Sequence, residues 1–226
     1  MCLNYYTLHK KRKEGTLPHL VLLGDSIFDN AHYVGKDLDV LAHLRRYLPH
    51  DWQATLLAID GSTSQELFRQ VQNIPTDATH LILSSGGNDA IREQPILQES
   101  ARTNLDAILQ LADLAEEFRR SYHRAVGWLS ETGLPLALCT IYHPIFPEPD
   151  FQKVAETVLA VFNDIIITEA VQSGLPVLDL RAVCSEVKDF SDTIEPSEIG
   201  GKKIALAVAA MFREHRFGKG KTAIFI

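Results

Sequence analysis

Four short polar turns hold the residues whose types and spacing can do chemistry. Ser26 lies in the turn Gly-Asp-Ser, and Gly61, Asn88 and the pair Asp192 and Glu195 follow later in the chain. Ser26 is a candidate nucleophile at a turn that leads toward a helical segment. The backbone N–H groups of Ser26 and Gly61 and the side-chain amide of Asn88 supply three hydrogen-bond donors. Three donors around one point stabilise the oxyanion of a tetrahedral intermediate, so the set matches the needs of acyl transfer.

Each of these residues also has an ordinary structural explanation. Asp and Ser accept backbone N–H groups at turns and helix starts, and glycine permits tight turns. The acids Asp192 and Glu195 precede a predicted helix, where the helix dipole favours negative charge. A single one of these turns is therefore weak evidence for a site, and their joint occurrence is what favours one.

The elements that must position these turns follow from the apolar pattern. Five short apolar runs indicate strands at residues 20–23, 54–59, 80–83, 134–141 and 177–180. Helical spacing or capping signals predict helices at residues 36–48, 63–75, 98–132, 151–173 and 197–214, with Thr63 and Glu66 spaced as a capping box. Strands that alternate with helices predict one doubly wound α/β domain with a parallel sheet. Right-handed crossovers then place the carboxyl ends of all strands, and the turns that follow them, along one edge.

Composition limits the classes of partner. The chain has 226 residues, 46% of them hydrophobic, with 22 basic and 29 acidic residues and a formal net charge of -7. This acidic balance argues against nucleic acid as the main partner, because phosphate binding needs a basic field. No stretch approaches the apolar length of a membrane span. The three cysteines show neither a disulfide framework nor a zinc pattern, which favours a reducing compartment and a cytoplasmic location.

The chain divides into three parts by its pattern. Residues 1–17 form a basic N-terminal arm, residues 18–217 a single domain, and residues 218–226 a C-terminal tail without a clear signal.

The ordered blocks resemble those of the SGNH hydrolases, also called the GDSL esterase/lipase family. Leu-Gly-Asp-Ser ending at Ser26 is similar to the first block, Gly61 to the second, and Gly-x-Asn-Asp around Asn88 to the third. Asp192-x-x-Glu195-Pro stands where the family has Asp-x-x-His-Pro. The resemblance implies a flavodoxin-like three-layer α/β/α sandwich, and the five apolar runs predict a five-stranded parallel sheet within it. It also implies Ser26 as nucleophile, an oxyanion hole from Ser26, Gly61 and Asn88, and hydrolysis of esters, thioesters or acetylated sugars without cofactor or metal.

The departure from the family is Glu195, which occupies the place of the catalytic histidine. A glutamate carboxylate reaches about as far as the imidazole, but its reference pKa of about 4.3 makes it a weaker base. We hypothesise a Ser26–Glu195–Asp192 triad in which a protonated Asp192 donates to Glu195 and orients it. His143, just past the fourth predicted strand, is an alternative base or a substrate contact.

The expected function is a serine hydrolase for carboxylic esters of small acyl or acetyl groups, a small-molecule substrate. The alternative is a catalytically inactive SGNH fold that binds a carbohydrate or an acyl group. A third hypothesis is a metal or phosphate site on Asp25, Asp29, Asp89 and Asp192. The sequence supports it less than the other two, because no Gly-x-x-x-x-Gly-Lys loop or His-rich ligand set accompanies these residues.

Overall fold

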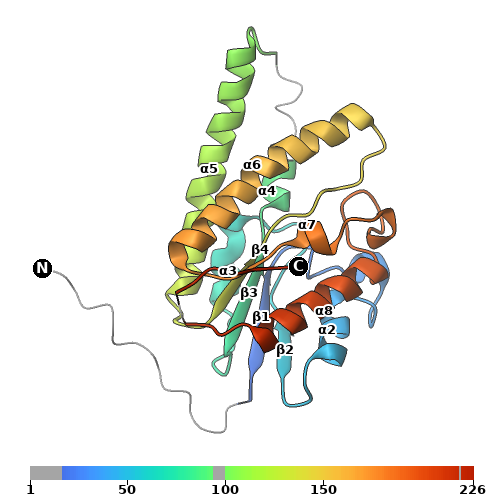
Figure 1. Cartoon of the computed structure of the whole chain (residues 1–226), viewed down its shortest axis with the longest axis vertical. Coiled ribbons are helices and arrows are strands. Elements are labelled where there is room, and N and C mark those ends of the chain that lie inside the picture. Colours follow the sequence, from blue (N-terminus) through green and yellow to red (C-terminus); the bar gives the residue numbers. More distant parts are fainter. Residues whose placement is uncertain (1–16, 94–99, 219) are drawn as a thin grey trace, which may run out of the picture.

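The computed structural model describes residues 17–93, 100–218 and 220–226. Nearly all of the predicted N-terminal arm lies outside these residues. A six-stranded parallel sheet has the order β2-β1-β3-β4-β5-β6 (Figure 1). Its strands are β1 (His19–Gly24), β2 (Gln53–Leu56), β3 (His80–Ser84), β4 (Leu136–Cys139), β5 (Val177–Leu178) and β6 (Ile224–Phe225). The predicted α/β class with a parallel sheet is confirmed.

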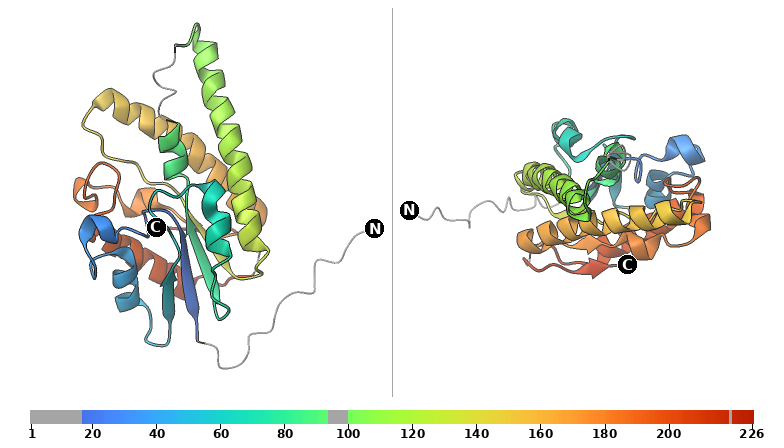
Figure 2. Two further views of the ribbon diagram at one scale, coloured as in Figure 1. Left: turned by 180° about the vertical axis from the view of Figure 1, so that it is seen from behind. Right: turned by 90° about the horizontal axis from the view of Figure 1, so that it is seen from above.

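The central strands are apolar without alternation because helices cover both faces of the sheet. Leu20 and Leu22 of β1 belong to one buried cluster, together with residues of α2 (Val40–Tyr47) and α8 (Glu198–Glu214). Val21 and Leu23 belong to a second cluster on the other face, with α3 (Leu67–Val71), α5 (Asn104–Ser130) and α6 (Pro149–Ser173). Figure 2 shows these helices on both sides of the sheet, which makes three layers.

The remaining helices are short and follow the strands. They are α1 (Ala31–Val34), η1 (Ser64–Glu66), α4 (Gly87–Arg92), α7 (Leu180–Val183) and η3 (Val187–Asp189). The N-terminal parts of α5 and α6 extend beyond the carboxyl edge of the sheet and diverge, with α4 between them (Figure 1). Within the described ranges, no helix is long and apolar enough to cross a membrane.

The sheet has six strands where the sequence predicts five. The extra strand β6 comes from the C-terminal tail. Two hydrogen bonds join it to the β5 segment: the Val177 N–H donates to the Ala223 carbonyl, and the Asp179 N–H donates to the Phe225 carbonyl, each at 2.8 Å. A two-residue edge strand carries too few residues to show the alternation that marks a strand in sequence. The tail therefore packs on the body of this chain.

Helix boundaries differ from prediction where a capping residue sets the start. The helix predicted at 36–48 begins at Val40, because the Asp39 carboxylate accepts the Ala42 N–H at 2.9 Å. The long helix predicted from residue 98 begins at Asn104, where Thr103 and Asp106 form a capping box. The other capping box, of Thr63 and Glu66, is confirmed.

Candidate active site

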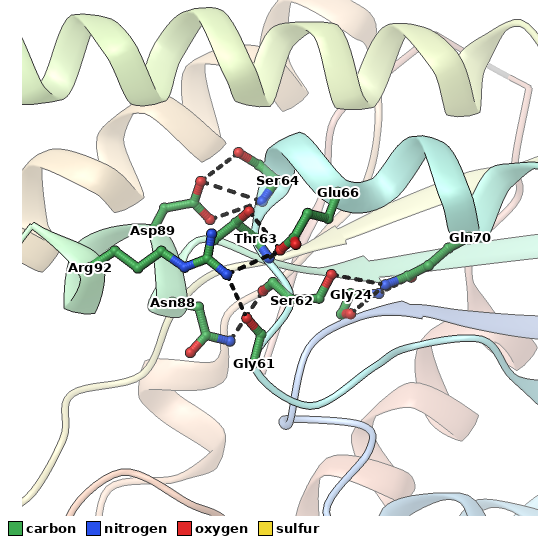
Figure 3. Close-up of polar contacts among 10 residues, drawn as sticks. All are labelled: Gly24, Gly61, Ser62, Thr63, Ser64, Glu66, Gln70, Asn88, Asp89 and Arg92. Carbon is green, nitrogen blue, oxygen red and sulfur yellow. Dashed lines mark hydrogen bonds and ion pairs between the residues drawn. The ribbon is translucent and has the colours of Figure 1, made fainter.

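The turn after β1 aims Ser26 at the carboxyl edge of the sheet. Gly24 has a φ of +123°, and a Cβ there would stand 1.6 Å from the Ser84 carbonyl oxygen, so only glycine fits against β3. The Gln70 side chain accepts the Gly24 N–H and donates to the Gly24 carbonyl, both at 2.8 Å (Figure 3). The Asp25 N–H donates to Ser84 at 3.2 Å. These bonds fix the backbone that carries the Ser26 hydroxyl.

Ser26 and Glu195 meet although they are far apart in sequence. The Ser26 hydroxyl donates to Glu195 Oε1 at 3.0 Å, and the two residues are only 7% and 5% exposed. Glu195 Oε2 is also buried, with no hydrogen-bond partner in the described part of the chain. The pKa of Glu195 is raised to about 7. Burial is the largest cause, the hydrogen bond from Ser26 acts in the opposite direction, and the charges of Asp60 and Asp192 add to the rise. Glu195 thus has the proton affinity of a base that works near neutral pH.

The segment around Glu195 is held by its own backbone and by Asp192. Asp192 Oδ1 accepts the N–H groups of Ile194 and Glu195, each at 2.8 Å. The Glu195 carbonyl accepts the Ser191 N–H at 2.9 Å. The structure therefore places Asp192 against the backbone of Glu195, where its carboxylate fixes the course of the chain.

A buried asparagine joins the nucleophile loop to the Glu195 segment. Asn30 Nδ2 donates to the Pro196 carbonyl at 3.2 Å, and Asn30 Oδ1 accepts the Val40 N–H at 2.9 Å. Asn30 has no exposed surface. One side chain thus connects the segment that follows Ser26, the start of α2 and the residue next to Glu195.

Two of the predicted oxyanion residues, Gly61 in the loop after β2 and Asn88 in the first turn of α4, lie close to each other (Figure 3). Asn88 Nδ2 donates to the Ser62 carbonyl at 3.1 Å, which leaves the second N–H of this amide for another acceptor. Arg92 donates to the Gly61 carbonyl at 3.3 Å, so both ends of α4 bind this loop. Within the described residues, no hydrogen bond engages the backbone N–H of Ser26 or Gly61.

A cavity of about 540 Å³ opens beside Ser26. Ser26, Asn88 and Glu195 line it, together with side chains of α4, α5 and α6. Gly61 lines a separate cavity of about 120 Å³. The structure therefore brings the Ser26 hydroxyl, the Glu195 carboxylate and the Asn88 amide to one space, whereas Gly61 lines a second cavity and contacts α4 through Arg92.

His143 does not share this space. Its neighbours Tyr142 and Pro144 line the cavity, whereas His143 itself is not among the lining residues in the part of the chain that the structure describes. Ser26 donates to Glu195 instead. The geometry thus favours Glu195 over His143 as the base.

The other carboxylates at this edge bind separate groups. Asp25 accepts the Ile27 N–H at 3.2 Å, Asp29 accepts the Asp60 N–H at 3.0 Å, and Asp89 accepts the Ser64 hydroxyl at 2.6 Å. Burial raises the pKa of both Asp25 and Asp89. No group of three or more His, Cys, Asp or Glu side chains arranged to hold a metal ion occurs among the described residues.

Comparison with known proteins identifies the family. Residues 22–201 match the GDSL-like Lipase/Acylhydrolase family. This chain belongs to that family. The match spans the turn at Ser26 and the segment at Glu195, so the family resemblance read from the sequence is confirmed. No curated protein matches the chain.

Solved structures show the same fold at low identity. An acetyl xylan esterase, AlAXEase, superposes with a TM-score of 0.65 at 15% identity, covering 87% of this chain and 100% of the other. Phospholipase A1 from Streptomyces albidoflavus NA297 gives 0.64 at 12% identity, covering 86% and 98%. The inhibitor-bound aryl esterase of M. Smegmatis gives 0.63 at 14% identity, covering 87% and 98%.

Sequence reasoning missed three residues that hold the site. Gln70, Asn30 and Tyr142 act through backbone groups distant in sequence, and the Tyr142 hydroxyl donates to the Ile194 carbonyl at 2.5 Å. Gln70 alone left a signal, because it interrupts the apolar face of the helix that follows Thr63, three residues after Leu67. The polar partners of Asn30 and Tyr142 appear only once the chain is folded.

Proposed function

We propose that this protein hydrolyses carboxylic esters, with Ser26 as nucleophile and Glu195 as general base. The observation that carries the proposal is the 3.0 Å hydrogen bond from the Ser26 hydroxyl to a buried Glu195 carboxylate at the edge of a cavity. Membership of the GDSL-like lipase/acylhydrolase family supports it. A nucleophile and base within hydrogen-bond reach are the core of covalent acyl transfer.

In acylation, Ser26 Oγ attacks the ester carbonyl carbon while Glu195 takes the hydroxyl proton. The carbonyl oxygen becomes an oxyanion, and the N–H groups of Ser26 and Gly61 and the second N–H of Asn88 are the proposed donors to it. When the intermediate collapses, the bond from carbon to the alcohol oxygen breaks, and Glu195 returns the proton to the leaving alcohol. The product of this half-reaction is an acyl ester of Ser26.

Deacylation repeats the steps with water. Glu195 takes a proton from water, the hydroxide attacks the acyl carbon, and Ser26 Oγ leaves and regains the proton, which releases the acid. We assign Asp192 a positioning role, because it accepts the backbone N–H groups of Ile194 and Glu195. Its charge also contributes to the raised pKa of Glu195.

The test is the hydrolysis of p-nitrophenyl butyrate by the wild type and the Ser26→Ala and Glu195→Gln variants. Loss of the base costs about 10²–10⁴-fold in a general-base step and more when the residues act as a unit. Glu198→Gln is the matched control, since Glu198 is an exposed carboxylate three residues further on and lies in the first turn of α8. We expect the control to keep the wild-type rate.

Covalent labelling separates catalysis from binding. Diethyl p-nitrophenyl phosphate should phosphorylate Ser26 of the wild type, detected by peptide mass spectrometry, and should not modify Glu195→Gln at a comparable rate. Turnover that survives Ser26→Ala would exclude the proposed nucleophile. Absence of turnover and of labelling in the wild type would favour the alternative, an inactive fold that binds a ligand in the same cavity.

A further inference from the structure

The cavity beside Ser26 has walls made mainly of carbon. Leu111 and Leu114 of α5 line one side, and Val154 and Val158 of α6 line another. Ile91 at the end of α4 lines the space between them. At about 540 Å³ the cavity lies within the range of pockets that bury a whole small ligand, about 300–1,000 Å³. An acetyl group fills only a small part of such a space.

Asp25, Ser26, Asn88 and Glu195 line the cavity at the carboxyl edge of the sheet. The other charged or amide side chains of its lining are Glu93, Gln110 and Lys153. On α6, Lys153 has a side chain 75% exposed, so its charge remains in solvent, and the Thr157 hydroxyl donates to the Lys153 carbonyl of its own helix at 2.8 Å. Because most of the lining contributed by α5 and α6 is apolar, with Gln110 the amide exception on α5, an apolar substrate group gains more from burial there than a polar one.

Packed aromatic rings shape the floor of the cavity. Phe162 of α6 lines the cavity and stacks on Phe118 of α5, with ring centroids 4.3 Å apart. Both rings are almost fully buried. Because this contact fixes the separation of α5 and α6 at the floor, the space above it exists before a ligand binds.

Exposed polar groups that do not line this cavity lie within electrostatic reach of Glu195. The Tyr33 hydroxyl donates to the Asp60 carboxylate at 3.0 Å in an exposed position, and the Asp60 N–H donates to Asp29. The polar alcohol part of a substrate suits these solvated surroundings, whereas the apolar cavity suits the acyl group that remains on Ser26.

We propose that the apolar cavity between α4, α5 and α6 holds the acyl chain of the substrate, so that the preferred esters carry unbranched chains of about eight carbons or more. This inference rests on the proposed hydrolysis at Ser26 and names its substrate class. It differs from the small acyl groups expected from the sequence, because that expectation had no information on the space between α5 and α6.

The test compares p-nitrophenyl acetate, butyrate and octanoate. Each methylene group transferred from water to an apolar wall can raise kcat/KM up to about fourfold. Octanoate has six more methylene groups than acetate, so the ratio of its kcat/KM to that of acetate has an upper bound of about 4,000. We expect a preference of at least tenfold for octanoate, since ordering of the chain offsets part of the gain. A wild-type enzyme that is Ser26-dependent but prefers acetate would overturn the inference and leave the proposed function intact.

Two alanines of α6 provide a matched pair of variants. Ala155 lines the cavity, whereas Ala160 is exposed on the same helix and does not line it. Ala155→Phe should reduce the ratio of octanoate to acetate kcat/KM at least tenfold, and Ala160→Phe should keep the wild-type ratio. If Ala155→Phe fails to fold, Leu114→Ala removes wall contacts instead and should lower octanoate kcat/KM. An unchanged ratio in the folded wall variant would overturn the inference.

A binding measurement keeps the inference testable if no ester is hydrolysed. Octanamide carries the same chain without a charge or a cleavable ester. Isothermal titration calorimetry should show saturable binding of octanamide to Ser26→Ala and at least tenfold weaker binding to the double variant with Ala155→Phe. Binding without any hydrolysis would reject the proposed function and retain the acyl-chain cavity, and absence of binding would reject the cavity assignment.

Discussion

The raised pKa of Glu195 gives a pH dependence that can be calculated. Only the carboxylate form accepts the Ser26 proton, so kcat/KM should rise with pH and reach half its plateau near pH 7, the pKa that burial and the neighbouring acids produce. At pH 5, two units lower, about one molecule in a hundred has the base form, so the rate should be about hundredfold below the plateau. A glutamate with an unshifted pKa would be almost fully active at pH 6.

Asp60→Asn perturbs this pKa without touching the hydrogen bond between Ser26 and Glu195. The negative charge of Asp60 raises the pKa of Glu195, so its removal should move the midpoint of the profile to lower pH. Asparagine keeps an oxygen that can accept the Tyr33 hydroxyl. An exposed charge contributes up to about 1 kcal/mol, and one pKa unit corresponds to about 1.4 kcal/mol, so the shift should be below about one unit.

The assay is initial-rate hydrolysis of p-nitrophenyl butyrate from pH 4.5 to 9, followed at the wavelength where p-nitrophenol and its anion absorb equally, so that the protonation of the product does not interfere. Asp51→Asn is the control, because Asp51 is an exposed acid in the turn before β2 and should keep the wild-type midpoint. A wild-type midpoint near 4.5 would refute burial as the source of the base strength. A shift of Asp60→Asn to higher pH would refute the electrostatic assignment.

Three further substitutions test the site and its scaffold. Asn88→Ala should lower kcat about 10²–10³-fold with little change in KM, as loss of an oxyanion donor does; an unchanged kcat would remove Asn88 from the oxyanion site. Gly24→Ala should lower the free energy of unfolding, measured in urea, by about 2–6 kcal/mol, because residue 24 has a positive φ and the added Cβ would overlap Ser84. Gly127→Ala is the control: Gly127 lies in a helix with open space around it, so alanine should stabilise the protein by up to about 1 kcal/mol. Equal effects of the two glycine variants would contradict the backbone argument. Asp25→Asn should raise the melting temperature more at pH 8 than at pH 4. The pKa of Asp25 is raised by burial, so the folded chain holds this proton to a higher pH than the unfolded chain does, and wild-type stability falls as pH rises. A pH-independent difference would refute this assignment.

The sequence predicts those parts of the fold that local pattern determines. The strand at β1 is buried on both faces, and this burial makes residues 20–23 continuously apolar. The turn at Gly24 can also be predicted from the sequence. The backbone there lies so close to Ser84 that only glycine fits, and this glycine marks the end of the apolar run. By contrast, β6 exists only through its pairing with β5, and two residues hold no periodic signal.

Side-chain contacts between distant segments are the part that sequence reasoning could not supply. Gln70 binds the backbone of Gly24 across 46 residues, and Asn30 binds Pro196 across 166. Neither amide lies in a recognisable motif with its partner. The width of the space between α5 and α6 depends on the stacking of Phe118 on Phe162, which is a tertiary contact. The size of the cavity is thus a property of helix packing, and the polar turns at the sheet edge do not reveal it.

Under the proposed mechanism Glu195 does the work of the family's histidine, and this changes what the rest of the site must provide. An imidazole has a reference pKa of about 6.5 and needs an acceptor for its second N–H, a role that suits a carboxylate at Asp192. Glu195 has no such N–H, and Asp192 Oδ1 accepts two backbone N–H groups instead. The base strength in this proposal comes mainly from burial, which together with the charges of Asp60 and Asp192 raises the pKa of Glu195 from 4.5 to about 7, close to that of imidazole. If the proposed chemistry holds, desolvation of a carboxylate replaces the intrinsic basicity of histidine.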